Sequence, residues 1–214
     1  MGEHQHIASA FDRDLDTIQA LVMRMGGMVE AAILDAAKAL ETHDADLAEQ
    51  VRRKDKAIDE LEEKINEETA RLIALRAPTA SDLRTALSVL KISASLERVG
   101  DYAKNIAKRA VILDQLTQVA GAGGSVRRMA RAVEAMIRDA LDAYNTRAVA
   151  LAGDVRRRDE GVDQMYNALF REFLLDLLRA KAAPEELARL RRRAAELLED
   201  DGANGSAAEL YREA

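Results

Sequence analysis

The chain carries the same segment twice, because residues 29–65 align without gaps on residues 133–169. Shared composition could explain matching alanines, but it would not place valines, arginines and aspartates in register. Such a repeat restricts the fold to an architecture built from a duplicated unit, and it predicts two similar lobes. The matched residues are Val29–Glu30–Ala31 with Val133–Glu134–Ala135, Ile33 and Asp35 with Ile137 and Asp139, Leu47–Ala48 with Leu151–Ala152, Val51–Arg52–Arg53 with Val155–Arg156–Arg157, and Asp55 and Asp59 with Asp159 and Asp163.

Both copies of the repeat have the composition of helices. The 214 residues contain two prolines, three phenylalanines and no tryptophan, and they are rich in alanine, leucine, glutamate and arginine. Sheet-forming alternation is absent, and capping residues mark the helix ends. The predicted helices cover residues 9–41, 44–77 and 79–118, and three more begin near Ser125, near the Asn145–Thr146 pair and near Pro184.

The apolar residues of the predicted helices recur at steps of four and three, the spacing of helices that pack in bundles. Each such helix buries one stripe and leaves the rest in water. The GAGGS segment at 121–125 indicates a flexible break between the two copies. We therefore predict an all-α fold of two tandem three-helix bundles, residues 1–120 and 121–214. The predicted buried stripes are Leu47, Val51, Ile58, Leu61, Ile65 and Leu72 in the second helix, and Ile92, Leu96, Val99, Ala103, Ile106, Ala110 and Leu113 in the third.

Composition argues against several classes of protein. Cysteine is absent, which rules out disulfides and thiolate metal sites and suits a reducing cytoplasm. The formal net charge is −6, so no overall basic field attracts nucleic acid. The N-terminus lacks the order of a signal peptide, and no stretch approaches the roughly 20 apolar residues of a membrane span. No P-loop, dinucleotide motif or nucleophile–base pair is evident. We expect a cytoplasmic protein that is not inserted in the membrane.

Acidic residues stand four apart on two of the predicted helices, although like charges at that spacing repel each other. The third helix places Glu97, Asp101 and Asn105 on one face, and the second places Asp55 and Asp59 likewise. This repulsion would be relieved by a bound cation, so the pattern needs an explanation beyond helix propensity.

The two acidic pairs should stand at the same height on neighbouring helices. The connection around Pro78 is short, so the second and third helices should be antiparallel neighbours. Asp59 and Glu97 lie 19 residues before and after Pro78. Four carboxylates at one level suit a hard or borderline cation such as iron, manganese, magnesium or calcium. At about 100° per residue, however, Glu97 and Asp101 fall nearly opposite the apolar stripe, which predicts a shallow surface site.

An ordinary solvated helix face is the alternative interpretation of these acids. Arg98, Lys104 and Lys108 nearby would partly compensate the negative charge, each ion pair contributing little. Gly100 favours a site slightly, because a glycine within a helix costs about 1 kcal/mol relative to alanine and suggests a close approach by a helix or an ion. Histidine contributes little, since the Glu3-x-x-His6 motif occurs once and a ferritin-like di-iron site needs two.

Several motifs stand in an order that resembles the PhoU family of bacterial phosphate-signalling regulators. The resemblance is dense over residues 9–113 and continues through the second copy of the repeat. The motifs that carry it are FDRDL at 11–15, MGGMVE at 25–30, DKAIDELE at 55–62, RLIALRAPTASDLR at 71–84, LKISASLERVGDYAKNIAKR at 90–109 and VRRRDEGVDQMYNALFREFL at 155–174.

The resemblance implies a cytoplasmic, non-enzymatic regulator with two repeated three-helix bundles. It implies contact with the ATPase subunit of a phosphate ABC transporter and with a phosphate-sensing histidine kinase, and a homodimer. It also implies a metal ion cluster on (Glu/Asp)-x-x-x-Asp motifs, with iron foremost and manganese, magnesium or zinc as alternatives. Carried over by motif, the metal ligands are Asp55 with Asp59, Glu97 with Asp101 and neighbouring Asn105, and Asp159 with Asp163.

The sixth predicted helix departs from the family pattern. A second LERVGDYAKNIA-like segment is expected there, but the chain reads PEELARLRRRAAELLED from Pro184, and only Glu196 and Asp200 keep an acidic i, i+4 spacing. A second metal site is therefore in question. Two other functions stay open: a hydrolytic metalloenzyme that activates water on the carboxylates, and a helical scaffold without metal.

Overall fold

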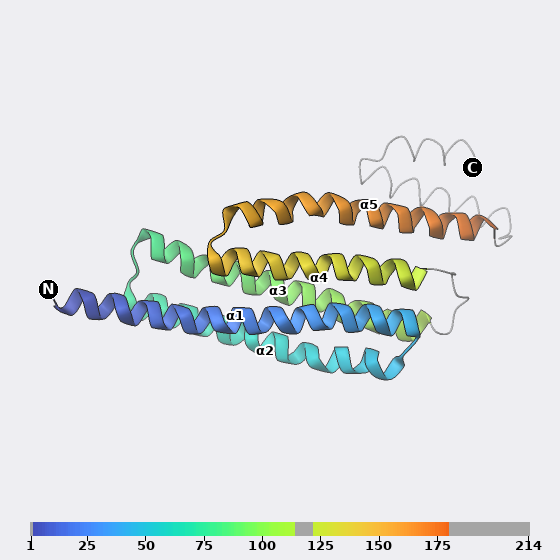
Figure 1. Ribbon diagram of the computed structural model, residues 1–214. Coiled ribbons are helices and arrows are strands. Elements are labelled where there is room, and N and C mark those ends of the chain that lie inside the picture. Colours follow the sequence, from blue (N-terminus) through green and yellow to red (C-terminus); the bar gives the residue numbers. More distant parts are fainter. Residues whose placement is uncertain (1, 114–121, 180–214) are drawn as a thin grey trace. The chain divides into compact units, whose positions relative to one another are not determined.

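The computed structural model describes residues 2–113 and 122–179, and the side-chain surroundings of residues 10–110 and 123–171. Within these ranges the chain is almost entirely helical and contains no strand, which confirms the predicted all-α class. The helix predicted from Pro184 lies outside the described residues. The described helices are α1 (Gly2–Thr42), α2 (Ala45–Arg76), α3 (Ala80–Leu113), α4 (Ala122–Thr146) and α5 (Val149–Arg179) (Figure 1).

The first helix boundaries follow the capping signals in the sequence. Asp44 caps α2, its carboxylate accepting a hydrogen bond of 2.8 Å from the backbone N–H of Leu47. Ala77 ends α2 in the left-handed conformation, with φ 44°. The hydroxyl of Thr79 then donates to the carboxylate of Asp82 at 3.2 Å, at the start of α3. The predicted turn around Pro78 is thereby confirmed.

Residues 122–125 of the glycine segment are helical, so this part is not the flexible break that the sequence predicted, and Gly121 lies outside the described residues. Helix α4 already begins at Ala122 and includes Gly123 and Gly124. A Cβ at Gly123 would lie 3.0 Å from the Cα of Glu41, so glycine lets the start of α4 approach the end of α1. Arg127 reinforces this contact with an ion pair of 2.8 Å to Glu41. Close packing, rather than flexibility, explains Gly123, whereas a Cβ at Gly124 would meet only the side chain of Arg128, at 3.7 Å.

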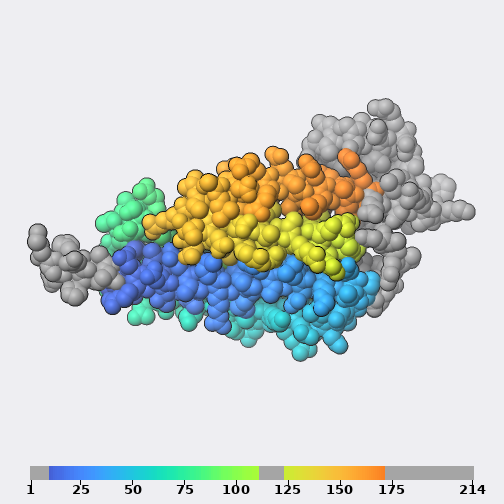
Figure 2. Space-filling view, in the orientation of Figure 1, coloured from blue at the N-terminus to red at the C-terminus, as the bar shows by residue number. Residues whose placement is uncertain are grey.

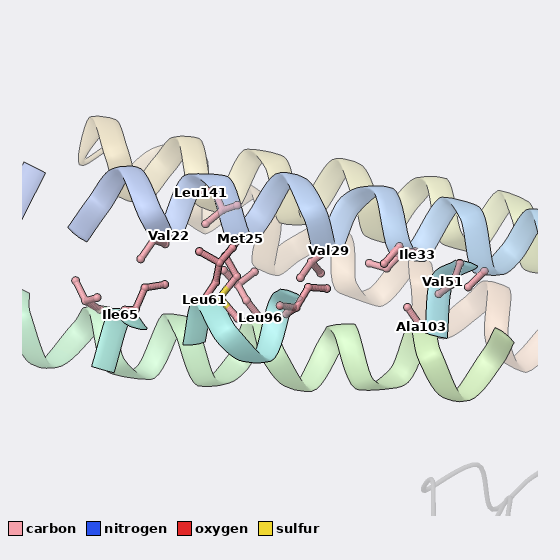
Figure 3. Close-up of a cluster of buried hydrophobic side chains, with 14 of the residues drawn as sticks. Val22, Met25, Val29, Ile33, Val51, Leu61, Ile65, Leu96, Ala103 and Leu141 are labelled. Carbon is pink, nitrogen blue, oxygen red and sulfur yellow. The ribbon is translucent and has the colours of Figure 1, made fainter. Parts of the chain in front are cut away.

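Helices α1, α2 and α3 pack against one another around a shared hydrophobic core. Figure 3 shows apolar side chains of α1 pointing toward α2 and α3. Helix α4 packs on α1 as well, and the two lie side by side on the face seen in Figure 2. The labelled core residues are Val22, Met25, Val29 and Ile33 of α1, Val51, Leu61 and Ile65 of α2, Leu96 and Ala103 of α3, and Leu141 of α4.

The buried stripe of α3 is rotated from its predicted position. Leu96, Ala103 and Ala110 are buried as expected, but Ile92, Val99 and Ile106 are only half-buried. Ile92 and Val99 instead line a groove between α3 and α4. The small residues on the other flank are buried because they let neighbouring helices come close. This observed stripe consists of Ala86, Val89, Ser93, Leu96, Gly100, Ala103, Ala107 and Ala110.

The internal repeat is a repeat of structure as well as of sequence. His43 and Arg147, which the gapless alignment pairs, both adopt left-handed backbone conformations, with φ 54° and 56°. The residue after each donates a backbone hydrogen bond to a carbonyl five residues earlier, Asp44 to Ala39 at 3.0 Å and Ala148 to Ala143 at 2.9 Å. The same turn therefore joins α1 to α2 and α4 to α5.

An ion pair across each of these helix pairs is also repeated. Lys54 of α2 lies 3.4 Å from Asp35 of α1, and Arg158 of α5 pairs with Asp139 of α4. Because Asp139 corresponds to Asp35 and Arg158 to Lys54, the same contact has been kept with a different cation. The duplicated unit thus extends beyond the turn into the paired helices.

By its contacts, the chain divides into two compact units, residues 1–163 and 164–214, with the division inside α5. The first unit includes α4 because that helix packs along α1. In the second unit the rings of Tyr166 and Phe170 stack, with centroids 6.5 Å apart. The predicted division into residues 1–120 and 121–214 follows the repeat and stays a prediction.

One segment among the described residues, residues 10–42 of α1, is long and apolar enough to cross a membrane by length and composition. The expectation that no stretch approached a membrane span was therefore too strict. Its apolar side chains nevertheless belong to the bundle core, since Ile18, Val22, Met25 and Val29 are at most 2% exposed. A core helix passes the same test of composition, so this segment is weak evidence for a membrane span.

The paired glycines of α1 provide a test of the α1–α4 contact. A Cβ at Gly26 would lie 2.1 Å from Cδ1 of buried Leu141, whereas a Cβ at Gly27 would meet nothing within 4 Å. We expect Gly27→Ala to stabilise the protein by up to about 1 kcal/mol, through helix propensity. Gly26→Ala should lie about 1–3 kcal/mol below it, because of overpacking. Urea unfolding of both variants measures the difference, and equal stabilisation would rule out the close contact.

Candidate carboxylate site

The four carboxylates that the sequence placed at one height lie on two packed helices, and Lys104 joins two of them, Asp55 and Asp101. Asp55 and Asp59 come from α2, and Glu97 and Asp101 come from α3, which packs against α2. Desolvation is the largest cause that raises the pKa of Asp59 and of Glu97, and the neighbouring carboxylates add to it, Asp55 foremost for Asp59 and Asp101 foremost for Glu97. The rotation of α3 produces this arrangement by turning Gly100 and its neighbours toward α2.

Asp55 is the buried member of the cluster. It is 4% exposed and continues the buried stripe of α2 between Val51 and Ile58. The expected shallow site is therefore wrong for this carboxylate, although Asp59 is exposed and Glu97 is half-buried. Its Oδ1 atom is buried and has no hydrogen-bond partner in the described structure. An unsatisfied buried oxygen is costly, so it marks a position where a ligand would be favourable.

Lys104 supplies the positive charge inside the cluster. Its Nζ lies 2.5 Å from Oδ2 of Asp55 and 3.2 Å from Oδ1 of Asp101. Hydrogen bonds to Asp55 and then to Asp101 raise the pKa of Lys104 well above its usual range. Sequence reasoning treated Lys104 only as a nearby compensating charge. The i, i+3 spacing from Asp101 could have indicated one contact, but the contact with Asp55 depends on helix rotation.

Gly100 leaves space beside the buried carboxylate. A Cβ at this position would lie 3.2 Å from Cδ1 of Ile58 and 3.7 Å from Oδ1 of Asp55. Helix packing against Ile58 is the tighter of the two contacts, so it accounts for the glycine at least as well as an ion does.

Glu62 is an acidic neighbour that sequence reasoning missed. It raises the pKa of Asp59 less than Asp55 and Asp101 do. It raises the pKa of Glu97 less than Asp101 and Asp59 do, but more than Asp55 does. Asn66 donates a hydrogen bond of 2.8 Å to Oε1 of Glu62. The position of Glu62, three residues after Asp59, could have indicated that it lies on the same helix face.

The remaining predicted site residues within the described ranges differ from Asp55 because they are exposed. Asn105 is exposed, one helical turn beyond Asp101. Asp159 and Asp163, the counterparts of Asp55 and Asp59 in the repeat, are both exposed on α5. The proposed partner pair of Glu196 and Asp200 lies outside the described residues. Among the described residues, buried Asp55 therefore has no buried counterpart in the second copy.

Comparison with known proteins places the chain in a family. A PhoU domain model matches residues 22–110 and again residues 126–199, once for each copy of the repeat. The chain belongs to the PhoU family. The resemblance drawn from the sequence motifs is thereby confirmed, and with it the repeated helical-bundle architecture of the PhoU fold.

Individual PhoU relatives agree with this assignment. A phosphate-specific transport system accessory protein PhoU homolog of Caulobacter vibrioides (strain NA1000 / CB15N) is 44% identical over 170 residues, which are 79% of this chain and 74% of that protein. One of Rhizobium meliloti (strain 1021) is 39% identical over 178 residues, 80% of this chain and 72% of that protein. The crystal structure of PhoU from Pseudomonas aeruginosa matches with a TM-score of 0.75 and 33% identity, covering 95% of this chain and all of that one.

The PhoU carboxylates have the donor chemistry of a cation site but not a preformed site. Four oxygen-bearing side chains from two helices, one with an unpartnered buried oxygen, suit a hard or borderline cation. Across the described ranges, however, no three acidic or histidine side chains converge closely enough to hold a metal as they stand. Asp55, Asp59, Glu97 and Asp101 are the side chains that would hold a metal, which would have to displace Lys104 and draw these carboxylates closer together.

The crowded carboxyls of this PhoU chain predict a dependence of stability on pH. Desolvation, and then the charge of Asp101, raise the pKa of Glu97 above its ordinary value of 4.5. The folded state therefore binds this proton more tightly than the unfolded state does. Ionised Glu97 then destabilises the fold above its folded pKa, and the penalty disappears as pH falls below 4.5.

Glu97→Gln should therefore stabilise chelator-treated protein at pH 7, and the gain should shrink toward zero as pH falls to the ordinary glutamate pKa. Glu63→Gln is the matched control, since Glu63 is exposed on α2 outside the cluster. Urea unfolding of both variants across this pH range measures the effect. Equal behaviour of the two variants would show that the cluster does not repel.

Proposed function

We propose that this chain is a non-enzymatic regulator of phosphate homeostasis, which restrains the phosphate-starvation response and phosphate uptake. The double match to the PhoU domain carries this proposal. The relatives in Caulobacter vibrioides and Rhizobium meliloti are named accessory proteins of the phosphate-specific transport system, and this name supports a non-enzymatic role. Helical bundles serve many functions, so the fold alone would not support this role.

The proposed partners are the ATPase subunit of the phosphate ABC transporter and the phosphate-sensing histidine kinase. In this proposal the chain acts in the cytoplasm as a homodimer and binds its partners through helix surfaces. It biases both partners toward their phosphate-replete states. Its carboxylate site holds metal, with iron as the leading candidate, and the metal has a structural or regulatory role. The exposed charges on its helices support a charged rim around the protein contacts.

Co-purification with the two partners tests this proposal. The net charge of −6 and the many exposed charged residues predict that the ATPase subunit binds directly and that binding weakens as salt rises. Charged rims mainly set the association rate and its salt dependence. Purified chain and purified ATPase subunit would be mixed in low and high salt, with an unrelated ATPase as control. Binding that is unchanged in high salt would contradict the electrostatic part, and failure to bind in low salt would contradict direct contact.

A further inference from the structure

We propose that Lys104 and a metal cation are alternative occupants of the same carboxylate site, so that Lys104 sets how tightly this chain binds metal. This inference rests on the metal site within the proposed function and adds a residue that controls it. In the absence of metal, the ammonium group takes the place of the cation. When metal binds, the lysine side chain leaves the carboxylates and extends into water.

The contacts of Lys104 place it where a cation would sit. Nζ lies 2.5 Å from Oδ2 of Asp55 on α2 and 3.2 Å from Oδ1 of Asp101 on α3. It therefore joins the two helices through oxygens of two of the proposed metal ligands. An ammonium group and a metal ion cannot share these lone pairs, because both need the carboxylate oxygens at close range.

The ammonium group leaves the site incompletely satisfied. Oδ1 of Asp55 is buried without a partner, although Oδ2 of the same carboxylate is paired. Lysine carries one positive charge, and its contacts with these acids reach Asp55 and Asp101 but not the oxygens of Asp59 or Glu97. A divalent or trivalent ion brings more charge and can accept more oxygen ligands. The cluster thus retains unused capacity for a cation while Lys104 occupies it.

Lys104 can leave more easily than the carboxylate can. The lysine side chain is 41% exposed, whereas Asp55 is 4% exposed and fixed in the stripe that packs against α3. Rotation about the flexible stem would carry the ammonium group into solvent without moving the backbone. Metal binding then displaces this side chain, and the metal affinity is reduced by whatever free energy the lysine contacts contribute.

Replacement of Lys104 should increase affinity for metal. Mn²⁺ would be titrated calorimetrically into chelator-treated wild type, Lys104→Met and Lys108→Met. Lys108 is exposed on the same helix one turn away and serves as the matched control. We expect Lys104→Met to bind Mn²⁺ at least about tenfold more tightly than wild type, which is a modest change in free energy. Lys108→Met should bind as wild type does, and equal affinities for all three proteins would overturn the inference.

A second measurement uses wild-type protein and so does not depend on a variant that folds. Acetylation of lysines by an amine-reactive ester would be mapped by mass spectrometry with and without Mn²⁺. Labelling of Lys104 relative to Lys108 should rise when Mn²⁺ is present, because the ammonium group is released. Unchanged relative labelling under conditions of measured binding would overturn the exchange. If neither wild type nor Lys104→Met binds Mn²⁺, the inference and the metal part of the proposed function both fail, while regulation through partner proteins is tested separately.

Discussion

Asp101→Ala should lose most of any tightly bound metal, whereas Asp163→Ala should retain it. Asp101 belongs to a group of four carboxylates contributed by two packed helices, with Asp55 buried at its centre. Asp163 is exposed on α5, and Asp159 beside it is exposed too. Two carboxylates on one helix leave most of a cation's coordination to water, while four from two helices can hold a cluster.

Metal analysis of the purified variants decides between symmetric and asymmetric binding. Iron, manganese, magnesium and zinc would be quantified per chain in wild type, Asp101→Ala and Asp163→Ala. Neither substituted residue is buried, so both variants should fold, and helix content measured by circular dichroism provides the control. Equal metal losses in the two variants would contradict the prediction that the N-terminal copy holds the metal.

Local signals in the sequence were sufficient for the helix ends and the repeat. Asp44, Pro78 and Thr79 act through neighbours within a few residues, and they lie where the structure has its caps and its turn. The in-register aspartates and valines likewise predicted a duplicated unit, which the shared turn at His43 and Arg147 bears out. Helix caps depend on neighbouring residues, and a repeat is visible by comparing the sequence with itself, so both can be identified without the packed structure.

Helix rotation and glycine packing could not be predicted in the same way. On α3, Ile92 and Val99 were the stronger apolar candidates, yet Ser93 and Gly100 are buried instead. Which face of α3 is buried depends on the helix that approaches it most closely. Small residues are buried where two helix backbones come close together. Gly123 shows the same effect, since its role depends on Glu41, more than eighty residues earlier.

The candidate site shows the same limit. Spacing from the turn at Pro78 brought Asp59 and Glu97 to one height, and the structure has their charges interacting. The burial of Asp55 and its pairing with Lys104 followed from the rotation of α3, which the heptad pattern misplaced. A contact between side chains 49 positions apart, as for Asp55 and Lys104, needs the packed helices before it can be identified.

Deletion of the gene in the source organism should derepress the phosphate-starvation response in phosphate-rich medium. A regulator that holds the histidine kinase in its phosphate-replete state acts when phosphate is plentiful, so its loss should remove repression under that condition. Starved cells should change little, because the response is already active there. The wild-type gene on a plasmid should restore repression in the deletion strain, which controls for effects on neighbouring genes.

Alkaline phosphatase activity in phosphate-rich cultures is the measurement that tests regulation most directly. Wild-type, deleted and complemented strains would be grown in high and low phosphate and assayed side by side. The proposed function predicts severalfold higher activity in the deletion strain in high phosphate, and a return to the wild-type level on complementation. Alkaline phosphatase that stays fully repressed in the deletion strain would contradict a regulatory role and favour a scaffold without a part in phosphate signalling.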